Sequence, residues 1–154
     1  MKIFDNLGHM AFKVKDLDAS VAFYEKLGFP KFLSLLNEKG EPWIVYMRIT
    51  DDVYLELFPK GAGDRVPEAE QVGLTHWCLT VKDLDETEKQ LKSVGISLSR
   101  PRRDARGVDR NRGMWIEDPD GHRIEIMEMA PNCLQYEAIA AWKAGKPPVA
   151  VKTG

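Results

Sequence analysis

His9-Met-Ala-Phe-Lys-Val-Lys-Asp-Leu-Asp18 recurs as His76-Trp-Cys-Leu-Thr-Val-Lys-Asp-Leu-Asp85, a shift of 67 residues from position 9 to position 76. The match continues beyond these stretches. With two further residues inserted, the Leu-Glu-Leu at 55–57 aligns with the Ile-Glu-Ile at 124–126. Because such matches follow one order over about fifty residues, they indicate that the chain carries one structural unit twice.

Each copy predicts the same order of elements. Residues 9–14 and 76–81 alternate in polarity, as strands do. Asp16 and Asp83 then open amphipathic helices, and a glycine ends each helix. Later strands are expected at 43–50, 53–59, 113–117 and 122–129. A short additional strand is expected at 32–36, with a counterpart near Leu98.

The predicted fold class is α+β, with two tandem βαβββ modules that form a curved sheet cleft and a C-terminal helix after them. We expect a single domain over residues 1–154. Its parts are module one at 4–59, a linker at 60–71, module two at 72–130, and a C-terminal helix and tail at 131–154.

Composition excludes several classes of protein. The 22 basic and 24 acidic residues give a net charge of -2, which provides no overall basic field for nucleic acid. No apolar run approaches the roughly 20 residues of a membrane helix. Cys78 and Cys133 form no CxxC pair, so neither a disulfide scaffold nor a thiolate zinc site is indicated. We therefore expect a cytoplasmic protein with neither nucleic acid nor membrane as a partner.

Strand alternation places four polar residues on the faces opposite the apolar ones: His9, Glu56, His76 and Glu125. One helix per copy covers only one face of its sheet, so these four side chains should point away from the helices. Two imidazoles and two carboxylates suit a divalent metal such as nickel, zinc, cobalt, manganese or iron(II). A single strand histidine or glutamate is more often structural. The recurrence of the pair in both copies favours metal ligands.

Five motifs within residues 7–130 carry a resemblance to a known family. They are Gly8-His-Met-Ala-Phe-Lys-Val14, Phe23-Tyr-Glu-Lys-Leu-Gly-Phe29, Tyr54-Leu-Glu-Leu-Phe58, Leu74-Thr-His-Trp-Cys-Leu-Thr-Val81 and Asp118-Pro-Asp-Gly-His-Arg-Ile-Glu-Ile126. Together they make the chain similar to the vicinal oxygen chelate superfamily. That family includes glyoxalase I, methylmalonyl-CoA epimerase, fosfomycin-resistance enzymes, extradiol dioxygenases and bleomycin-binding proteins.

The resemblance implies roles for His9, Glu56, His76, Glu125 and Lys13. In the family, such His and Glu positions bind one divalent metal per site, which chelates two adjacent substrate oxygens. Glutamate at both strand positions is most similar to the glyoxalase I (lactoylglutathione lyase) branch, which implies a lyase or isomerase with Glu56 and Glu125 as proton-transfer groups. Lys13 stands where bacterial glyoxalases tend to place an arginine associated with holding glutathione. We expect Lys13 to bind the substrate, but this departure from the pattern argues against glutathione as part of it.

Other readings remain open. The resemblance also permits a metal-dependent epimerase, a fosfomycin-type resistance enzyme or a non-enzymatic drug-binding protein. Small members of the family usually build each site from modules of two chains, which implies a homodimer.

Six of the nine arginines lie within residues 100–112: Arg100, Arg102, Arg103, Arg106, Arg110 and Arg112. The segment is either a solvated loop or a flap that captures an anionic small-molecule substrate, because guanidinium groups match carboxylate and phosphate geometry. Arg112, nearest the next strand, is the substrate-binding candidate. We expect His122 to be exposed and outside the metal set, and Cys78 to be a small buried thiol.

Overall fold

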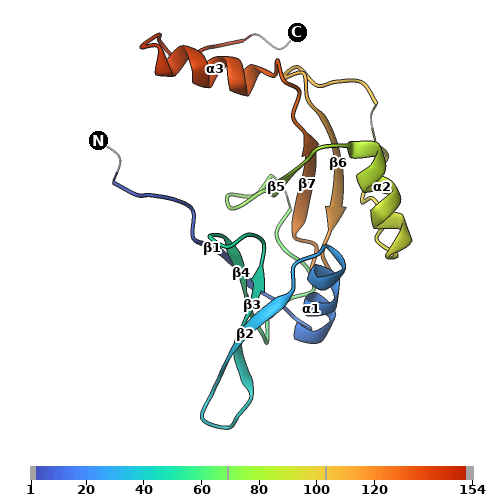
Figure 1. Cartoon of the computed structure of the whole chain (residues 1–154). Helices are drawn as coiled ribbons and strands as arrows, with labels where there is room; N and C mark the ends of the chain where they lie inside the picture. The colour runs from blue at the N-terminus through green and yellow to red at the C-terminus, as the bar shows by residue number, and fades with distance from the viewer. Residues whose placement is uncertain (1–2, 69, 103, 152–154) are drawn as a thin grey trace. The chain divides into compact units, whose positions relative to one another are not determined.

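The computed structural model describes residues 3–68, 70–102 and 104–151, and the chain divides into two compact units (Figure 1). The first unit comprises the residues up to Gly73 together with Glu117–His122. The second comprises Leu74–Ile116 and the residues from Arg123 onward. The units thus follow the two sequence repeats, except that a turn of the second repeat belongs to the first unit.

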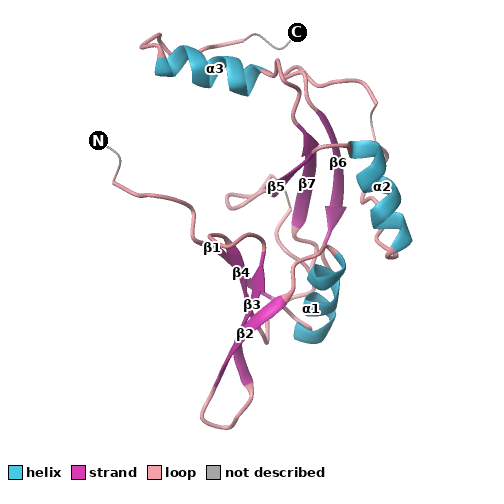
Figure 2. Ribbon diagram, in the orientation of Figure 1, coloured by secondary structure: helices cyan, strands magenta, loops and turns pink. Residues whose placement is uncertain are grey.

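The first unit is a four-stranded sheet with one helix (Figure 2). Its elements are β1 (His9–Lys13), α1 (Leu17–Lys26), β2 (Lys31–Leu36), β3 (Pro42–Arg48) and β4 (Tyr54–Phe58). The strand order is β1-β4-β3-β2; β1 is parallel to β4, and the other neighbours are antiparallel.

Local signals explain where α1 begins and which face it buries. The Asp16 side chain accepts a hydrogen bond from the Ala19 backbone nitrogen at 3.0 Å, which satisfies one free amide of the first turn. Gly28 ends the segment with a φ of 84°, a left-handed conformation that glycine adopts readily. Ser20 and Tyr24 are the buried residues of the helix. The core of the unit also contains the fully buried strand side chains of Met47, Leu55 and Leu57, and that of Val14, which directly follows β1.

The second unit is a three-stranded sheet with two helices (Figure 2). Its elements are β5 (Trp77–Val81), α2 (Leu84–Ser93), β6 (Arg112–Glu117), β7 (Arg123–Glu128) and α3 (Leu134–Lys143). The order is β5-β7-β6, and β5 is parallel to β7. Asp83 caps α2 as Asp16 caps α1, accepting from the Glu86 backbone nitrogen at 2.9 Å. Leu84 and Leu91 are the buried residues of α2.

The α+β prediction with two modules and a C-terminal helix is confirmed, but the second module is βαββ because the strand expected near Leu98 is missing. One ladder-like hydrogen bond is present there, from the Ser99 backbone nitrogen to the Trp115 oxygen at 2.8 Å. Pro101 follows two residues later and has no N–H to donate, so the ladder cannot continue. No helix among the described residues combines the length and apolar character that crossing a bilayer requires.

A buried carboxylate holds the Glu117–His122 turn within the first unit. The Asp118 side chain accepts a hydrogen bond from the Tyr24 hydroxyl at 2.8 Å. It also accepts from the backbone nitrogens of Asp120, at 3.0 Å, and His122, at 2.8 Å. Asp118 therefore joins the turn to α1.

This arrangement predicts a loss of stability at alkaline pH. Burial, followed by the charge and hydrogen bond of Asp118, raises the pKa of Tyr24 well above its ordinary value of 10.0. An unfolded tyrosine ionises near its ordinary value, so the folded state keeps its proton more tightly. The contribution to stability is complete below pH 10.0 and declines as the pH rises beyond it. Urea unfolding at several pH values should show a steeper alkaline decline for wild type than for Tyr24→Phe; equal slopes would contradict this.

Candidate metal centre

The first unit brings His9 and Glu56 together on one face of its sheet. β1 and β4 pair with Ala11 opposite Glu56, so His9 lies two residues before that pairing and on the same side of β1. His9 Nε2 and Glu56 Oε2 are 3.7 Å apart. Phe12 and Leu57 are buried on the opposite face, so the predicted alternation of these strands is confirmed.

The second unit repeats the arrangement with His76 and Glu125. β5 and β7 pair with Cys78 opposite Glu125, so His76 again lies two residues before the partner of the glutamate. His76 Nε2 and Glu125 Oε2 are 3.3 Å apart. The repeat therefore extends from the sequence to the strand register and to the facing atoms of both pairs.

Each pair presents an imidazole nitrogen beside a carboxylate oxygen, and these donor types suit borderline divalent metals. Among the described residues, the only ion-pair partner of each glutamate is its own histidine. Two of the expected associations are therefore present, His9 with Glu56 and His76 with Glu125. That the two pairs surround one ion, within one chain or across a dimer, stays a prediction.

Aromatic rings surround the pair of the first unit. The Tyr54 ring is stacked 5.4 Å from the His9 ring and lies 5.6 Å from the Tyr46 ring and 5.9 Å from the Phe32 ring. Partial burial and the nearby Glu56 charge raise the pKa of Tyr46. The Tyr54 ring therefore restricts the His9 imidazole, and Tyr46 and Phe32 pack against Tyr54.

Two neighbours orient His76 in the second unit. The Thr75 hydroxyl lies 3.0 Å from His76 Nδ1, and the Trp115 ring meets the imidazole edge-on at 4.9 Å. When the Nδ1–H of a histidine donates to such a partner, its Nε2 carries the free lone pair and can bind a metal. In His76 that Nε2 is the atom beside Glu125.

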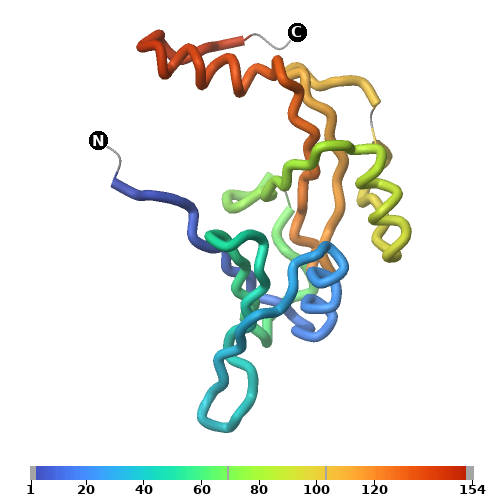
Figure 3. Tube along the Cα trace, in the orientation of Figure 1, coloured from blue at the N-terminus to red at the C-terminus, as the bar shows by residue number. Residues whose placement is uncertain are grey.

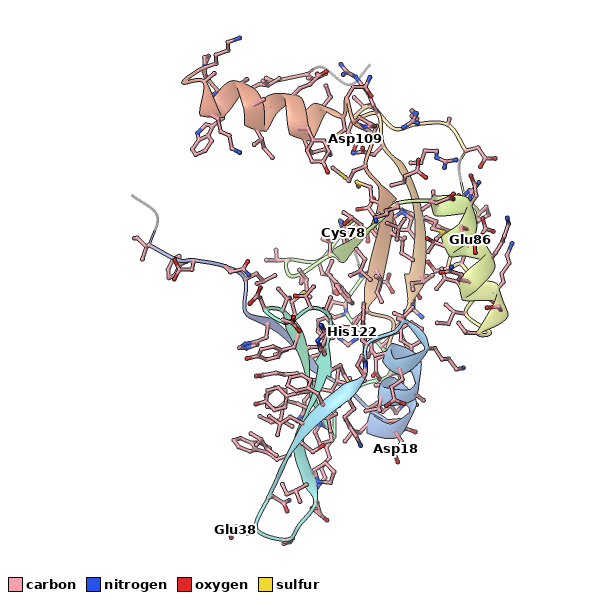
Figure 4. All side chains as sticks on the ribbon, viewed as in Figure 1. Asp18, Glu38, Cys78, Glu86, Asp109 and His122 are labelled. Atoms are coloured by element: carbon pink, nitrogen blue, oxygen red, sulfur yellow. The ribbon has the colours of Figure 1, made fainter. Side chains whose placement is uncertain are left out.

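Cys78 is exposed, so the expectation of a buried thiol was wrong. Its side chain projects from β5, as Figure 4 shows. The part of the thiol that the sheet covers, together with the nearby Glu125 carboxylate, raises the pKa of Cys78 to about 11. The thiol is therefore protonated at neutral pH, which disfavours nucleophilic attack.

The two predicted substrate residues lie in different surroundings. Lys13 is exposed on the His9 face of β1. Arg112 shares a face of β6 with the buried Met114 and Ile116, the face opposite Trp115. Its guanidinium is already bound by two carboxylates, as described next.

Arg112 makes a two-point contact with Glu128, with nitrogen–oxygen distances of 2.6 and 3.2 Å, and reaches Asp85 at 3.2 Å. Glu128 also accepts from the Leu84 backbone nitrogen at 2.9 Å, at the start of α2. The pKa of Glu128 is lowered, chiefly by the hydrogen bond from Arg112. These contacts join α2 to the sheet.

We expect Arg112→Gln to reduce the free energy of unfolding by about 1–3 kcal/mol, because it leaves a half-buried carboxylate without its charged partner. Denaturant titration measures this loss. Arg48→Gln is the control, since Arg48 pairs with the exposed Asp51 in the first unit and is not among the contacts of Glu128. An unchanged unfolding midpoint together with a raised KM would instead favour the substrate-binding role.

The sequence reasoning missed a polar cluster formed by Asp118, Asp120 and His122, whose ligand atoms lie within 4.8 Å of one another. His122 is half-buried, not exposed as expected: its Nδ1 lies 2.8 Å from Asp118 Oδ2, and its ring is stacked 4.5 Å from Phe12. The Asp118 oxygens also receive the Tyr24 hydroxyl and two backbone amides. Because these donors occupy the acceptor positions of Asp118, we interpret the cluster as a structural one that stabilises the turn.

Relatives in sequence include proteins of several activities. The Metallothiol transferase FosB of Bacillus licheniformis is 26% identical over 127 residues, covering 78% of this chain and 73% of that protein. The Bleomycin resistance protein of Klebsiella pneumoniae is 32% identical over 122 residues, covering 74% and 85%. The chain is also 26% identical over 132 residues to the "Probable lactoylglutathione lyase, chloroplastic" of Arabidopsis thaliana, covering 80% of this chain but only 36% of that protein.

Solved structures share the fold. A glyoxalase family protein from Enterococcus faecalis matches with a TM-score of 0.71 and 25% identity, covering 82% of this chain and 100% of that one. A mutant of the fosfomycin resistance protein FosX from Listeria monocytogenes, in complex with Mn(II) and a dihydroxypropylphosphonic acid, matches with a TM-score of 0.62. Its identity is 20% and it covers 84% of this chain and 94% of that one, so it supports the fold alone.

One family model matches most of the chain, and this match identifies the family. The family model for the Glyoxalase/Bleomycin resistance protein/Dioxygenase superfamily matches residues 6–126, which include both histidine–glutamate pairs. This confirms the resemblance drawn from the five sequence motifs. The chain belongs to the Glyoxalase/Bleomycin resistance protein/Dioxygenase superfamily.

Proposed function

We propose that the protein is a divalent-metal-dependent lyase or isomerase of the glyoxalase type. The metal ligands are His9, Glu56, His76 and Glu125, and the substrate is a small molecule with two adjacent oxygens. The observation that carries the proposal is the repeated pair: in each unit an imidazole Nε2 lies beside a glutamate oxygen, at 3.7 Å and 3.3 Å.

The residues fit such an ion. Half-buried carboxylates in the middle of strands are costly unless a cation meets them. Among the described residues, no lysine or arginine pairs with Glu56 or Glu125. A neutral histidine supplies no positive charge, so a divalent cation would complete both pairs.

When bound, the metal would act as a Lewis acid that stabilises negative charge developing on substrate oxygens. The chain's own residues move the proton. One glutamate accepts a proton from the carbon next to a carbonyl, and the proton returns to the neighbouring carbon. Tyr46 lies close enough to Glu56 for the carboxylate charge to raise the pKa of the tyrosine, so its ring lines the space beside this glutamate. Thr75 and Trp115 hold the His76 ring.

Metal analysis combined with turnover tests the proposal. We expect gently purified protein to contain a stoichiometric divalent metal, to lose activity on chelation and to recover it when nickel, zinc, cobalt, manganese or iron(II) is added back. Methylglyoxal should be supplied with several thiols and with none. Metal-free protein that binds no added ion would contradict the proposal. If metal-loaded protein turns over no thiol adduct, only the lactoylglutathione lyase assignment is contradicted, and the metal site stands.

Two alternatives are favoured by particular relatives. The similarity to the metallothiol transferase FosB supports a metal-dependent resistance enzyme or epimerase. The 32% identity to a bleomycin resistance protein supports a drug-binding protein. Fosfomycin consumption with a thiol present distinguishes the first alternative, and tight bleomycin binding by metal-free protein distinguishes the second.

We further propose that the enzyme is a cytoplasmic homodimer with Lys13 at the substrate site. Lys13 lies on the His9 face of β1, which supports its assignment. Sedimentation of the purified protein tests the dimer.

A further inference from the structure

The arginine-rich segment contains one guanidinium that differs from the rest. The segment runs from the end of α2 to the start of β6 (Figure 3), and Arg103 lies outside the described residues. The other described arginines of the segment are bound by acidic side chains or backbone oxygens: Arg102, Arg106, Arg110 and Arg112. Among the described residues, Arg100 has no such partner.

The Arg100 guanidinium instead lies over an aromatic ring. Its Cζ atom is 4.1 Å from the centroid of the Trp115 ring. Trp115 in turn meets the His76 ring at 4.9 Å. The guanidinium carbon and the imidazole centroid are therefore no more than about 9 Å apart. This separation is within the reach of a molecule that carries an anionic group a few bonds from its two chelating oxygens.

These groups share the functional face of the second unit. Trp115 alternates along β6 with the buried Met114 and Ile116, so it lies on the face opposite the helix side. Gly113 lies on this face as well, and a Cβ atom there would be 3.7 Å from a Glu125 oxygen. Any side chain at this position would therefore begin in contact with the Glu125 carboxylate.

We propose that Arg100, stacked on Trp115, binds the anionic group of the substrate and selects small chelating molecules that carry a carboxylate or phosphonate a few bonds from the two chelating oxygens. The inference rests on the proposed metal site and names its substrate class. Stacking on the indole leaves the N–H edge of the guanidinium free for a two-point contact with an anion. Arg112, which is bound by Glu128 and Asp85, has no comparable free edge.

A matched pair of ligands tests the proposal by calorimetry on nickel-loaded protein. Acetohydroxamate carries two chelating oxygens and no further charge; succinic monohydroxamic acid carries the same chelating group and a carboxylate. We expect wild type to bind the second at least tenfold more tightly, because a charge-assisted contact is added. Arg100→Gln should abolish this preference while leaving acetohydroxamate binding unchanged. Arg106→Gln, the matched control, should keep it.

The outcomes separate the two proposals. If wild type binds acetohydroxamate but shows no preference for the carboxylate, or if Arg100→Gln keeps the preference, the role of Arg100 is overturned and the metal site stands. If the protein takes up no stoichiometric nickel, the metal site is overturned and the Arg100 inference with it; if nickel is taken up but neither hydroxamate binds, the Arg100 inference alone is overturned. Arg100→Lys should retain only part of the preference, since lysine keeps the charge and loses the planar fork. A hydroxamate that carries a phosphonate in place of the carboxylate shows which anion the site prefers. Tighter binding of either charged hydroxamate than of acetohydroxamate supports the inference.

Discussion

Replacing Glu125 by glutamine is expected to reduce turnover by about 100- to 10,000-fold, even when metal is supplied at saturation. Glutamine keeps the shape and one coordinating oxygen of glutamate, but its amide cannot accept a proton at neutral pH. We also expect weaker metal binding, because the amide oxygen carries no negative charge. Steady-state kinetics at increasing metal concentration separates the two effects.

The control for Glu125→Gln is Glu86→Gln, which makes the same chemical change on the exposed side of α2. Glu86→Gln should leave both turnover and metal content unchanged. Glu56→Gln makes the equivalent change in the other repeat, and a smaller loss there would identify Glu125 as the principal base. If Glu125→Gln retains full turnover at saturating metal, a proton-transfer role for this residue is excluded.

Asp118→Ala is expected to reduce the free energy of unfolding by about 3 kcal/mol. The substitution leaves the fully buried Tyr24 hydroxyl without its carboxylate partner and removes the acceptor of two backbone amides in the turn. An unsatisfied buried polar group costs more than the hydrogen bond itself contributed. Urea titration followed by circular dichroism measures the change.

Tyr24→Phe provides the matched comparison, because it removes the hydroxyl and leaves the turn's own hydrogen bonds intact. We expect it to cost less than Asp118→Ala. The double variant should cost less than the two single losses combined, since both remove the same contact. Strict additivity would show that Tyr24 and Asp118 do not stabilise each other.

Much of the fold could be predicted because the same local signals occur in both copies of the repeat. The capping aspartates, the glycines that end the helices and the alternation of the strands are local signals, and each appears twice. The same alternation placed each histidine and glutamate on the correct face. It also places Arg112 with Met114 and Ile116, away from Trp115, so the surroundings of Arg112 could have been read from the sequence.

Other features depend on contacts between distant parts of the chain. Tyr24 and Asp118 are separated by 94 positions, and no local pattern links them. His122 is half-buried because its ring contacts Asp118 and stacks on Phe12. The turn residues around His122 carry no sign of the Phe12 contact, so the local sequence predicted an exposed side chain. The strand expected near Leu98 was inferred from its counterpart in the first repeat, but Pro101 overrides the symmetry.

The assignment of Glu117–His122 to the first unit has a consequence for biosynthesis. The first unit is discontinuous along the polypeptide, and Asp118 is the acceptor for the hydroxyl at the centre of its core. A ribosome that has released only the first repeat has not yet made this residue. The first unit therefore cannot complete the packing of its core until residues 117–122 have been synthesised. Chaperones have most opportunity to bind the incompletely folded first repeat during that interval.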